Sequence, residues 1–382
     1  MTSVFLDFNS STPCDQKVID SMNQYWKIPG NPHSSVHAFG WNKNNVIEEA
    51  RSSIANLLNV FTEDLFFTSG ATESNNIAIL SGLRTAARNS PSKFIVVTTW
   101  LEHPSVIEPL KIICNEFNLR LHFVSLNKEG FINVEELRQL FSSGNVLWFS
   151  SCNVSGEIGT VQDIELLGKL CLEFDVIFHV DATQGTYEQM KPLDYNVDFM
   201  SMSAHKIYGP TGIGLLYVRN FEESGVEPLF YGGGQQNGLR PGTIPSPLVV
   251  GYGRAFELLY ENISREIEYL TSLRNYLFTS LQNQFPVILN GSTSKRHPGN
   301  LHVQIKGVDA LTLLNNVQPN LAFSLGSACS SGHIRISNAL KAIGLTDEQA
   351  FSSFRISCGR FTTKKQIDQA IKILHGAYCK LI

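Results

Sequence analysis

The chain has 382 residues, 43% of them hydrophobic and 17% charged, with 30 basic against 34 acidic side chains and a net charge of −4. This charge balance gives no sign of a basic surface that could bind nucleic acid or a membrane. It favours small molecules or other proteins as partners. No stretch approaches the ~20 apolar residues of a membrane span, and the first residues lack the features of a secretory signal. The seven cysteines are odd in number and contain no CxxC pair, which indicates a reduced, cytoplasmic protein.

Apolar, β-branched runs alternate with segments of helical periodicity up to about residue 218. We expect strands at 65–68, 94–99, 119–126, 146–154, 176–183 and 213–218. Helices are expected at 41–58, 77–87, 105–117, 134–141 and 164–174. Continuously apolar strands that alternate with helices predict an α/β fold, in which helices cover both faces of a mostly parallel sheet.

The pattern changes after residue 218. Residues 231–247 are rich in Gly and Pro and predict a long loop, which in a compact domain is usually functional. A long helix is expected at 248–284, and a second series of short strands and helices follows from residue 286. We therefore expect a large α/β domain at 15–260, and a smaller α/β domain formed by residues 1–14 and 261–382.

Two polar motifs follow predicted strands of the large domain. Lys206 stands in the loop SAHKIYGPTG (203–212), where a lysine can form a Schiff base with an aldehyde cofactor. By residue type alone, a solvated surface lysine is the commoner case. Asp181 ends the apolar run IFHVD (177–181), where it can pair with a pyridinium nitrogen or cap the next helix.

Two further motifs are expected at the same edge of the sheet. The segment TSGAT (68–72) leads from a strand into a helix, where N–H groups can bind an anion or form a capping box with Glu73. His103 follows another strand; such a histidine is more often structural, but beside an aromatic cofactor it can stack and move protons. Together, these four motifs would supply partners for the phosphate, the aromatic ring, the pyridinium nitrogen and the aldehyde of pyridoxal phosphate.

The ordered motifs of the chain resemble those of the cysteine desulfurases, which are fold-type I, class V aminotransferase enzymes that use pyridoxal phosphate. The resemblance covers nearly the whole chain. Its segments are LDFNSSTP (6–13), GNPHSSVHAFG (30–40), TSGATESNN (68–76), EH (102–103), EIGTVQDI (157–164), VDATQ (180–184), SAHKIYGPTGIG (203–214), RPGTIP (240–245), GSACSSG (326–332) and FRISCGRFTT (354–363).

The resemblance implies a role for each matching residue. Lys206 would hold the cofactor and shuttle the substrate's Cα proton, Asp181 would pair with the pyridine nitrogen, and Gln184 would bind the phenolic oxygen. His103 would stack on the ring and serve as acid and base, and Arg355 would clamp the substrate carboxylate. The phosphate would be held by Ala71, Thr72, Ser203 and His205, and by Thr243 of the other subunit of a homodimer.

Cys329 lies in the small, polar segment LGSACSSG, unlike Cys114 and Cys171, which lie in apolar runs. A nucleophilic thiol needs exposure and thiolate character. The resemblance makes Cys329 the residue that takes the sulfur of L-cysteine as a persulfide, releases alanine and passes the sulfur to a protein acceptor. The acceptor would serve iron–sulfur assembly, DNA phosphorothioation or tRNA thiolation.

The chain departs from the family pattern at two places. Gly156 stands where the family has an asparagine that contacts the cofactor region, and the chain ends at HGAYCKLI without the further tail of housekeeping desulfurases, which weakly favours a specialised sulfur route. Two other interpretations stay open: a selenocysteine lyase or class V transaminase, and a weakly catalytic sulfur-relay subunit. His33 and His37 lack a third ligand, so no metal is expected.

Overall fold

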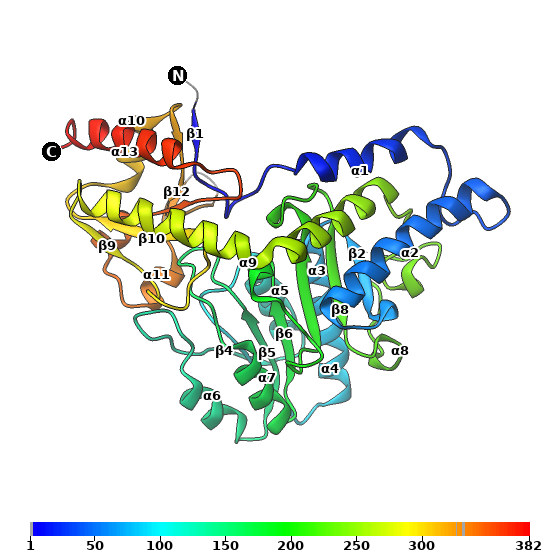
Figure 1. Cartoon of the computed structure of the whole chain (residues 1–382). Coiled ribbons are helices and arrows are strands. Elements are labelled where there is room, and N and C mark those ends of the chain that lie inside the picture. Colours follow the sequence, from blue (N-terminus) through cyan, green and yellow to red (C-terminus); the bar gives the residue numbers. More distant parts are fainter. Residues whose placement is uncertain (1–2, 326, 331–332) are drawn as a thin grey trace.

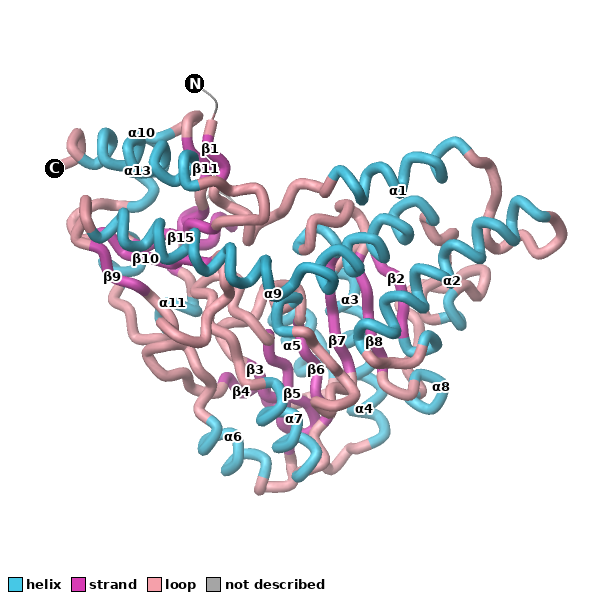
Figure 2. The backbone as a smooth tube through the Cα atoms, in the orientation of Figure 1, coloured by secondary structure: helices cyan, strands magenta, loops and turns pink. Residues whose placement is uncertain are grey.

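The computed structural model describes residues 3–325, 327–330 and 333–382, with the backbone alone at 186, 327–330 and 333–335. Its centre is a seven-stranded sheet (Figures 1 and 2). In spatial order its strands are β2 (Leu65–Thr68), β8 (Gly214–Val218), β7 (Phe199–Ser203), β6 (Ile177–Asp181), β5 (Val146–Cys152), β3 (Ile95–Thr98) and β4 (Arg120–Phe123). Only β8 runs against its neighbours. The predicted α/β fold with a mostly parallel sheet is confirmed.

Helices cover both faces of this sheet, because alternate strand residues point to opposite sides. In β2, for example, Leu65 and Phe67 enter one buried cluster and Phe66 enters the other. The first face packs on α2 (Ala38–Leu58), α6 (Val134–Phe141), α7 (Ile164–Glu173) and α9 (Ser246–Gln282). The second face packs on α3 (Ala71–Ile77), α4 (Arg84–Asn89) and α5 (Pro104–Glu116). Burial on both faces explains the continuously apolar strands.

The C-terminal part has its own antiparallel sheet, in the order β12 (Ser324–Leu325), β15 (Ser353–Ser357), β10 (Asn300–Ile305) and β9 (Val287–Leu289). Its helices are α10 (Ala310–Val317), α11 (Asn338–Ala342), α12 (Asp347–Phe351) and α13 (Lys364–Tyr378). Between β12 and α11 the strands β13 (Ser327–Ser330) and β14 (His333–Ile336) pair antiparallel, with Cys329 opposite Ile334.

The first residues lie with the C-terminal part of the fold. Strand β1 (Val4–Phe5) pairs in parallel with β11 (Leu321–Ala322), and both chain ends lie at the same end of the molecule (Figure 1). Helix α9 runs from the large sheet to this second part (Figure 1). The division into residues 15–260 and residues 1–14 with 261–382 stays a prediction, and its boundary after residue 260 falls inside helix α9.

Two elements carry too weak a pattern to be predicted. Helix α1 (Gln16–Lys27) is largely polar and buries only Val18 and Met22, although Asp15 caps it by accepting the N–H of Lys17. Strand β7 reads FMSMS and has no β-branched residue. The region expected as one helix at 77–87 is a run of α3, a π-helix at Ala78–Leu83 and α4, and a short helix, α8, spans Phe221–Ser224. In the described part of the chain, no helix has the length and apolar character needed to cross a membrane.

Candidate active site

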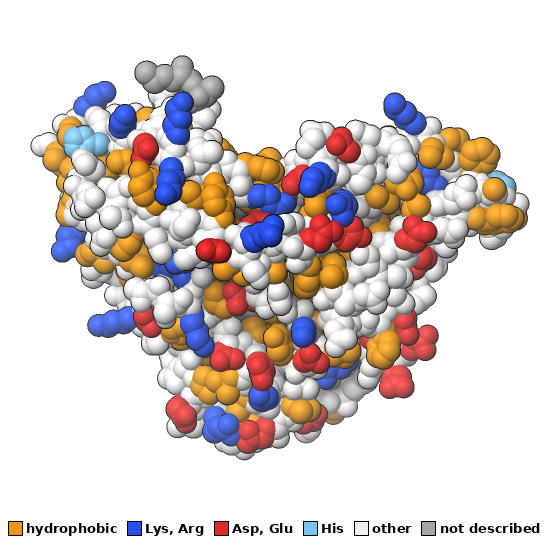
Figure 3. Space-filling model, viewed as in Figure 1, with side chains coloured by type: hydrophobic (Ala, Val, Ile, Leu, Met, Phe, Trp, Pro, Cys, Tyr) orange, Lys and Arg blue, Asp and Glu red, His pale blue; other side chains and the backbone are white. Residues whose placement is uncertain are grey.

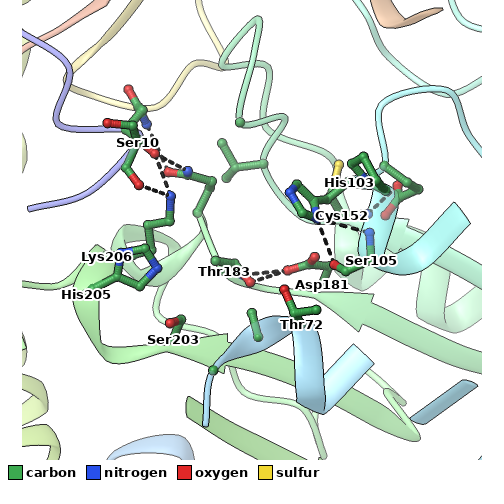
Figure 4. A pocket seen from close by; sticks show the side chains of 18 of the residues that line it. Ser10, Thr72, His103, Ser105, Cys152, Asp181, Thr183, Ser203, His205 and Lys206 are labelled. Atoms are coloured by element: carbon green, nitrogen blue, oxygen red, sulfur yellow. Dashed lines mark hydrogen bonds between the residues drawn. The ribbon is translucent and has the colours of Figure 1, made fainter. Parts of the chain in front are cut away.

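A pocket of about 710 Å³ opens at the carboxyl edge of the large sheet. Four segments reach it directly after strands β2, β3, β6 and β7, which all run in the same direction, so their ends meet at one edge. Of the residues singled out in the sequence, those that line it are Ala71, Thr72, His103, Asp181, Gln184, Ser203, His205, Lys206 and Arg355. Figure 4 places Lys206 and His103 on opposite sides, with Asp181 between them.

Asp181 is a buried carboxylate fixed by three donors at the end of β6. Its Oδ2 accepts from Asn75 Nδ2 at 2.9 Å, and its Oδ1 accepts from the backbone N–H of Thr183 at 3.0 Å and from the Thr183 hydroxyl. The helix-capping alternative is therefore wrong, because Asp181 closes a turn onto Thr183 and caps no helix. These three donors fix the orientation of the carboxylate.

The Lys206 amine has no carboxylate partner in the described structure. Its Nζ donates to the backbone carbonyls of Asn9 at 2.7 Å and Ser10 at 2.8 Å, from the segment that joins β1 to α1. Burial, with a smaller contribution from the Arg355 charge, lowers the pKa of this amine from 10.5 to about 8, although Asp181 opposes the shift. A substantial fraction of Lys206 is therefore neutral and nucleophilic near neutral pH.

This shift predicts how the apoprotein takes up pyridoxal phosphate. Only the neutral amine attacks an aldehyde, so the rate of attachment should rise with pH, reach half of its maximum near pH 8 and level off above about pH 9. At pH 7 the neutral fraction is about 10%, against about 0.03% for an unperturbed lysine. The measurement is the absorbance change when apoprotein and pyridoxal phosphate are mixed between pH 6 and 10. A rate that still climbs between pH 9 and 10 would contradict the lowered pKa.

His103 caps α5 and faces the pocket. Its Nδ1 accepts the backbone N–H of Ser105 at 3.1 Å and lies 2.8 Å from the Ser105 hydroxyl, which in turn accepts from Asn75 Nδ2 at 2.9 Å. Burial lowers the pKa of His103, with Asp181 opposing and Lys206 reinforcing the shift. The neutral ring therefore carries its proton on Nε2. Asn75 joins His103 and Asp181 in one network. His103 therefore has a structural role as the cap of α5, and its role beside a cofactor stays a prediction.

The Ala71–Thr72 end of the pocket is built to receive an anion. Gly70 has φ +153°, which lets the chain turn into α3, and a Cβ at this position would lie 3.9 Å from Ser203 Oγ. The first N–H groups of a helix have no acceptor within it. The expected capping box is not formed, because the N-cap of α3 is Gly70, which has no side chain, although Glu73 accepts the Ser69 N–H at 2.5 Å.

His205, on the other side of this end, lies 3.1 Å from the Ser11 hydroxyl through its Nδ1. Burial and the Lys206 charge lower the pKa of His205 to about 4, so it is a neutral donor or acceptor rather than a cation at neutral pH.

Arg355, in β15, reaches the pocket from the C-terminal part. Its Nη2 donates to Asp7 Oδ1 at 2.8 Å and to Ser324 Oγ at 2.9 Å, and its Nη1 donates to the carbonyl of Gly156 at 2.8 Å. Its Nε is buried with no hydrogen-bond partner in the described structure. A buried guanidinium with a spare donor is suited to a carboxylate ligand.

Gln184 is fixed by a pair of hydrogen bonds with Asn9: its Nε2 donates to the Asn9 carbonyl at 2.7 Å, and its Oε1 accepts from Asn9 Nδ2 at 3.0 Å. Gly156 faces this pair. A Cβ added to Gly156 would lie 3.4 Å from Gln184 Cγ, which is an ordinary van der Waals contact. The position therefore has room for a side chain directed toward Gln184.

Two predicted site residues are not among the described lining residues of the pocket. Thr243 is exposed and does not line the pocket of its own chain. Cys329 has its backbone in β13, but its side chain lies outside the described residues. Of the other cysteines, Cys358 is buried, and burial raises the pKa of its thiol to about 12, which supports a packing role.

Three pocket residues were missed by sequence reasoning. Glu102 is buried and Glu157 is half-buried, and desolvation raises the pKa of each carboxyl to about 7. Cys152 is buried beside Asp181 in the sheet register, and burial raises its pKa well above the usual value. The only signal for Glu102 and Glu157 was their place in matching segments. His37 caps α2 through Nδ1, and among the described residues no His, Cys, Asp and Glu cluster could hold a metal.

The residues present fit pyridoxal phosphate. The pocket offers a carboxylate oriented by three donors, a lysine with a lowered pKa and no carboxylate partner in the described structure, a neutral histidine, and the first turn of helix α3. When bound, this cofactor supplies an electron sink for a carbanion at the substrate's α-carbon.

Comparisons with known proteins agree with this site. Residues 4–370 match the family model described as aminotransferase class-V. The chain is 41% identical to a mitosomal cysteine desulfurase of Trachipleistophora hominis, over 99% of this chain and 86% of that protein. It is 36% identical to the cysteine desulfurase IscS of Rickettsia typhi, over 99% of this chain and 92% of that protein.

Solved structures give the same result. A NifS-like protein superposes with a TM-score of 0.90 at 29% identity, covering 100% of both chains. A structure described as SspA in complex with cysteine superposes with a TM-score of 0.82 at 31% identity, covering 94% of this chain and 100% of that one. The chain therefore belongs to the class-V aminotransferase family, within the group that includes the cysteine desulfurases.

Proposed function

We propose that this protein is a pyridoxal-phosphate-dependent cysteine desulfurase, which converts L-cysteine to L-alanine and passes the sulfur to a protein acceptor. The observation that carries the proposal is the meeting of Lys206, Asp181 and Arg355 in one pocket of a chain similar to cysteine desulfurases over 99% of its length. The structure of SspA in complex with cysteine supports the same substrate.

The residues of the pocket divide the work. Lys206 would hold the cofactor through its amine and would move the proton at the substrate's Cα. Asp181, held by Asn75 and Thr183, would pair with the ring nitrogen, and Gln184 would bind the phenolic oxygen. Ala71, Thr72, Ser203 and His205 would hold the phosphate. His103 would stack on the ring and would exchange a proton at Nε2.

Arg355 binds the substrate carboxylate, and its Asp7 and Ser324 partners fix the guanidinium beforehand. The Cys329 thiolate then attacks the sulfur of the substrate. An S–S bond forms on Cys329 as the substrate's Cβ–S bond breaks, and the carbon fragment gains a proton and leaves as alanine. Cysteine and a thiol thus become alanine and a persulfide, with no external oxidant or reductant.

We propose a homodimer in which Thr243 of each chain reaches the phosphate of its partner. Thr243 is exposed and away from its own pocket. Large apolar side chains are exposed in the neighbouring segments, namely Trp26, Val36, Phe39, Trp41, Phe230 and Tyr231. Figure 3 shows hydrophobic surface on the projecting end formed by α1 and α2. Such patches mark protein interfaces. A cytoplasmic location stays a prediction.

The experiment that tests the function is a product assay on the purified holoenzyme. With L-cysteine and a thiol reductant, sulfide and alanine should appear in equal amounts, while a keto-acid acceptor should not be needed. A requirement for a keto acid would favour a class V transaminase. Activity with L-selenocysteine alone would favour a selenocysteine lyase. The acceptor is then found by asking which candidate protein takes the sulfur.

The relay-subunit alternative rests on Gly156. If this glycine limits turnover, Gly156→Asn should fold like the parent and form alanine up to about tenfold faster, the value of one added hydrogen bond near Gln184. A matched control is Gly185→Ala, because a Cβ there would lie 1.5 Å from Asn153 Nδ2 and should destabilise the fold. An unchanged or slower rate in a folded Gly156→Asn protein would show that Gly156 does not limit turnover.

A further inference from the structure

The hairpin of strands β13 and β14, which carries Cys329, is held at both of its ends by serine hydroxyls. Ser324, in β12 just before the hairpin, donates to both carboxylate oxygens of Asp7 at 2.8 Å. Ser337, which directly follows β14, donates to Glu157 Oε2 at 2.6 Å. The two carboxylates stand on either side of Arg355, since its Nη2 binds Asp7 and its Nη1 binds the carbonyl that precedes Glu157.

Helix α11 keeps Ser337 in this place. Ser337 is its N-cap and accepts the Ala339 N–H at 3.1 Å. Ala339 and Leu340 of this helix pack in a small apolar cluster with Leu101, Cys152 and Ile158. Leu101 and Cys152 line the pocket, and Ile158 directly follows Glu157, which also lines it. The end of the hairpin is therefore packed against the pocket as well as hydrogen-bonded to it.

The side chain of Glu157 makes few other contacts in the described structure. It is half-buried and lines the pocket, and its Oε1 is buried with no hydrogen-bond partner among the described residues. His302 Nε2, 3.9 Å away and also without a partner, faces this oxygen. Burial raises the pKa of Glu157 to about 7 and lowers that of His302 to about 3, so the pair is not an ion pair at neutral pH. The hydrogen bond that Ser337 donates satisfies the other carboxyl oxygen of Glu157, Oε2.

We propose that Glu157 is a positioning residue, which fixes Ser337 and thereby the C-terminal end of the Cys329 hairpin at the substrate pocket. It acts through Ser337 and not on the substrate. This inference rests on the proposed function, because it concerns the step in which Cys329 attacks sulfur. It predicts that losing the Glu157–Ser337 hydrogen bond slows that step and spares the earlier one, in which the substrate binds and loses its Cα proton.

The test separates the two steps in the holoenzyme. On addition of L-cysteine, the first absorbance change of the cofactor reports substrate binding and proton loss, and the first equivalent of alanine reports attack by Cys329. Ser337→Ala should keep the absorbance change and KM, and form alanine about tenfold more slowly, the scale of one lost hydrogen bond. Ser337→Thr, which retains the hydroxyl, should restore the rate. Thr346→Ala removes a similar cap from α12, away from the pocket, and should leave alanine formation unchanged.

Variants of Glu157 make the test independent of the helix cap. Glu157→Gln keeps an acceptor for Ser337 and should behave like the parent, whereas Glu157→Ala should match Ser337→Ala. The double variant Glu157→Ala with Ser337→Ala should be no slower than either single variant, since both remove the same bond. Additive losses, a slow Glu157→Gln protein, or parent-like alanine formation by a folded Ser337→Ala protein would overturn the proposal. A parent protein that forms no alanine would instead overturn the proposed function.

Discussion

Replacing Cys329 by Ala is expected to abolish formation of alanine and sulfide from L-cysteine, by about a thousandfold or more, while the cofactor stays bound. The physical reason is that no other described thiol can take its place. Cys152 is the only described cysteine that lines the pocket, and burial beside Glu102 and Asp181 raises its pKa well above the usual value. A thiol that stays protonated is a poor nucleophile.

The measurement compares Cys329→Ala with the parent and with Cys379→Ala. Cys379 is exposed at the end of α13 and has no contact with the pocket, so its loss should change nothing. Cofactor absorbance and its change on adding L-cysteine should survive in all three proteins, because those depend on Lys206 and not on the thiol. If Cys329→Ala forms alanine at the parent rate, sulfur leaves by another route and the role given to Cys329 is wrong.

Lys206→Ala is expected to have the second large effect. The variant loses the amine that attaches the cofactor and the base that moves the Cα proton, and general acid–base catalysis alone contributes about 10²–10⁴-fold. Alanine formation should fall by at least that factor. The backbone carbonyls of Asn9 and Ser10, which accept from the Lys206 amine, would lose their donor, so a modest fall in thermal stability is also expected.

Covalent attachment is the decisive readout for Lys206. After borohydride reduction and denaturation, pyridoxal should remain bound to the parent chain and be absent from Lys206→Ala. Lys295→Ala, which removes an exposed lysine, serves as the control and should keep the label. A Lys206→Ala protein that retains the label on a different lysine would contradict the assignment.

Much of the site could be predicted because its side chains follow directly on strands. Asp181, His103 and Thr72 each stand within a few residues of a predicted strand, and strands that run in the same direction bring such positions to one edge. Lys206 follows β7, whose pattern is too weak to be predicted, and its loop is recognised by its small, polar, Gly- and Pro-flanked sequence. The α/β fold itself followed from the same alternation. The family resemblance added Arg355, which lies in the C-terminal sheet and which no local pattern connects with the large sheet.

The remaining parts depend on contacts between distant segments. The carbonyls that receive the Lys206 amine belong to residues 9 and 10, and a backbone carbonyl has no signature in a sequence. Asn75 and Asp181 are 106 positions apart, and Glu157 and Ser337 are 180 apart. Buried carboxyls such as Glu102 resemble surface residues in a sequence, since only the fold decides their burial and hence their raised pKa.

The central claim is that sulfur moves from L-cysteine to Cys329. The most direct test mixes the holoenzyme with one equivalent of L-cysteine, without reductant or acceptor, and measures alanine together with the masses of the cysteine-containing peptides. The account predicts one alanine per chain, and a Cys329 peptide heavier by one sulfur atom. Alanine without added sulfur on Cys329, or sulfur on the Cys152 peptide instead, would contradict it.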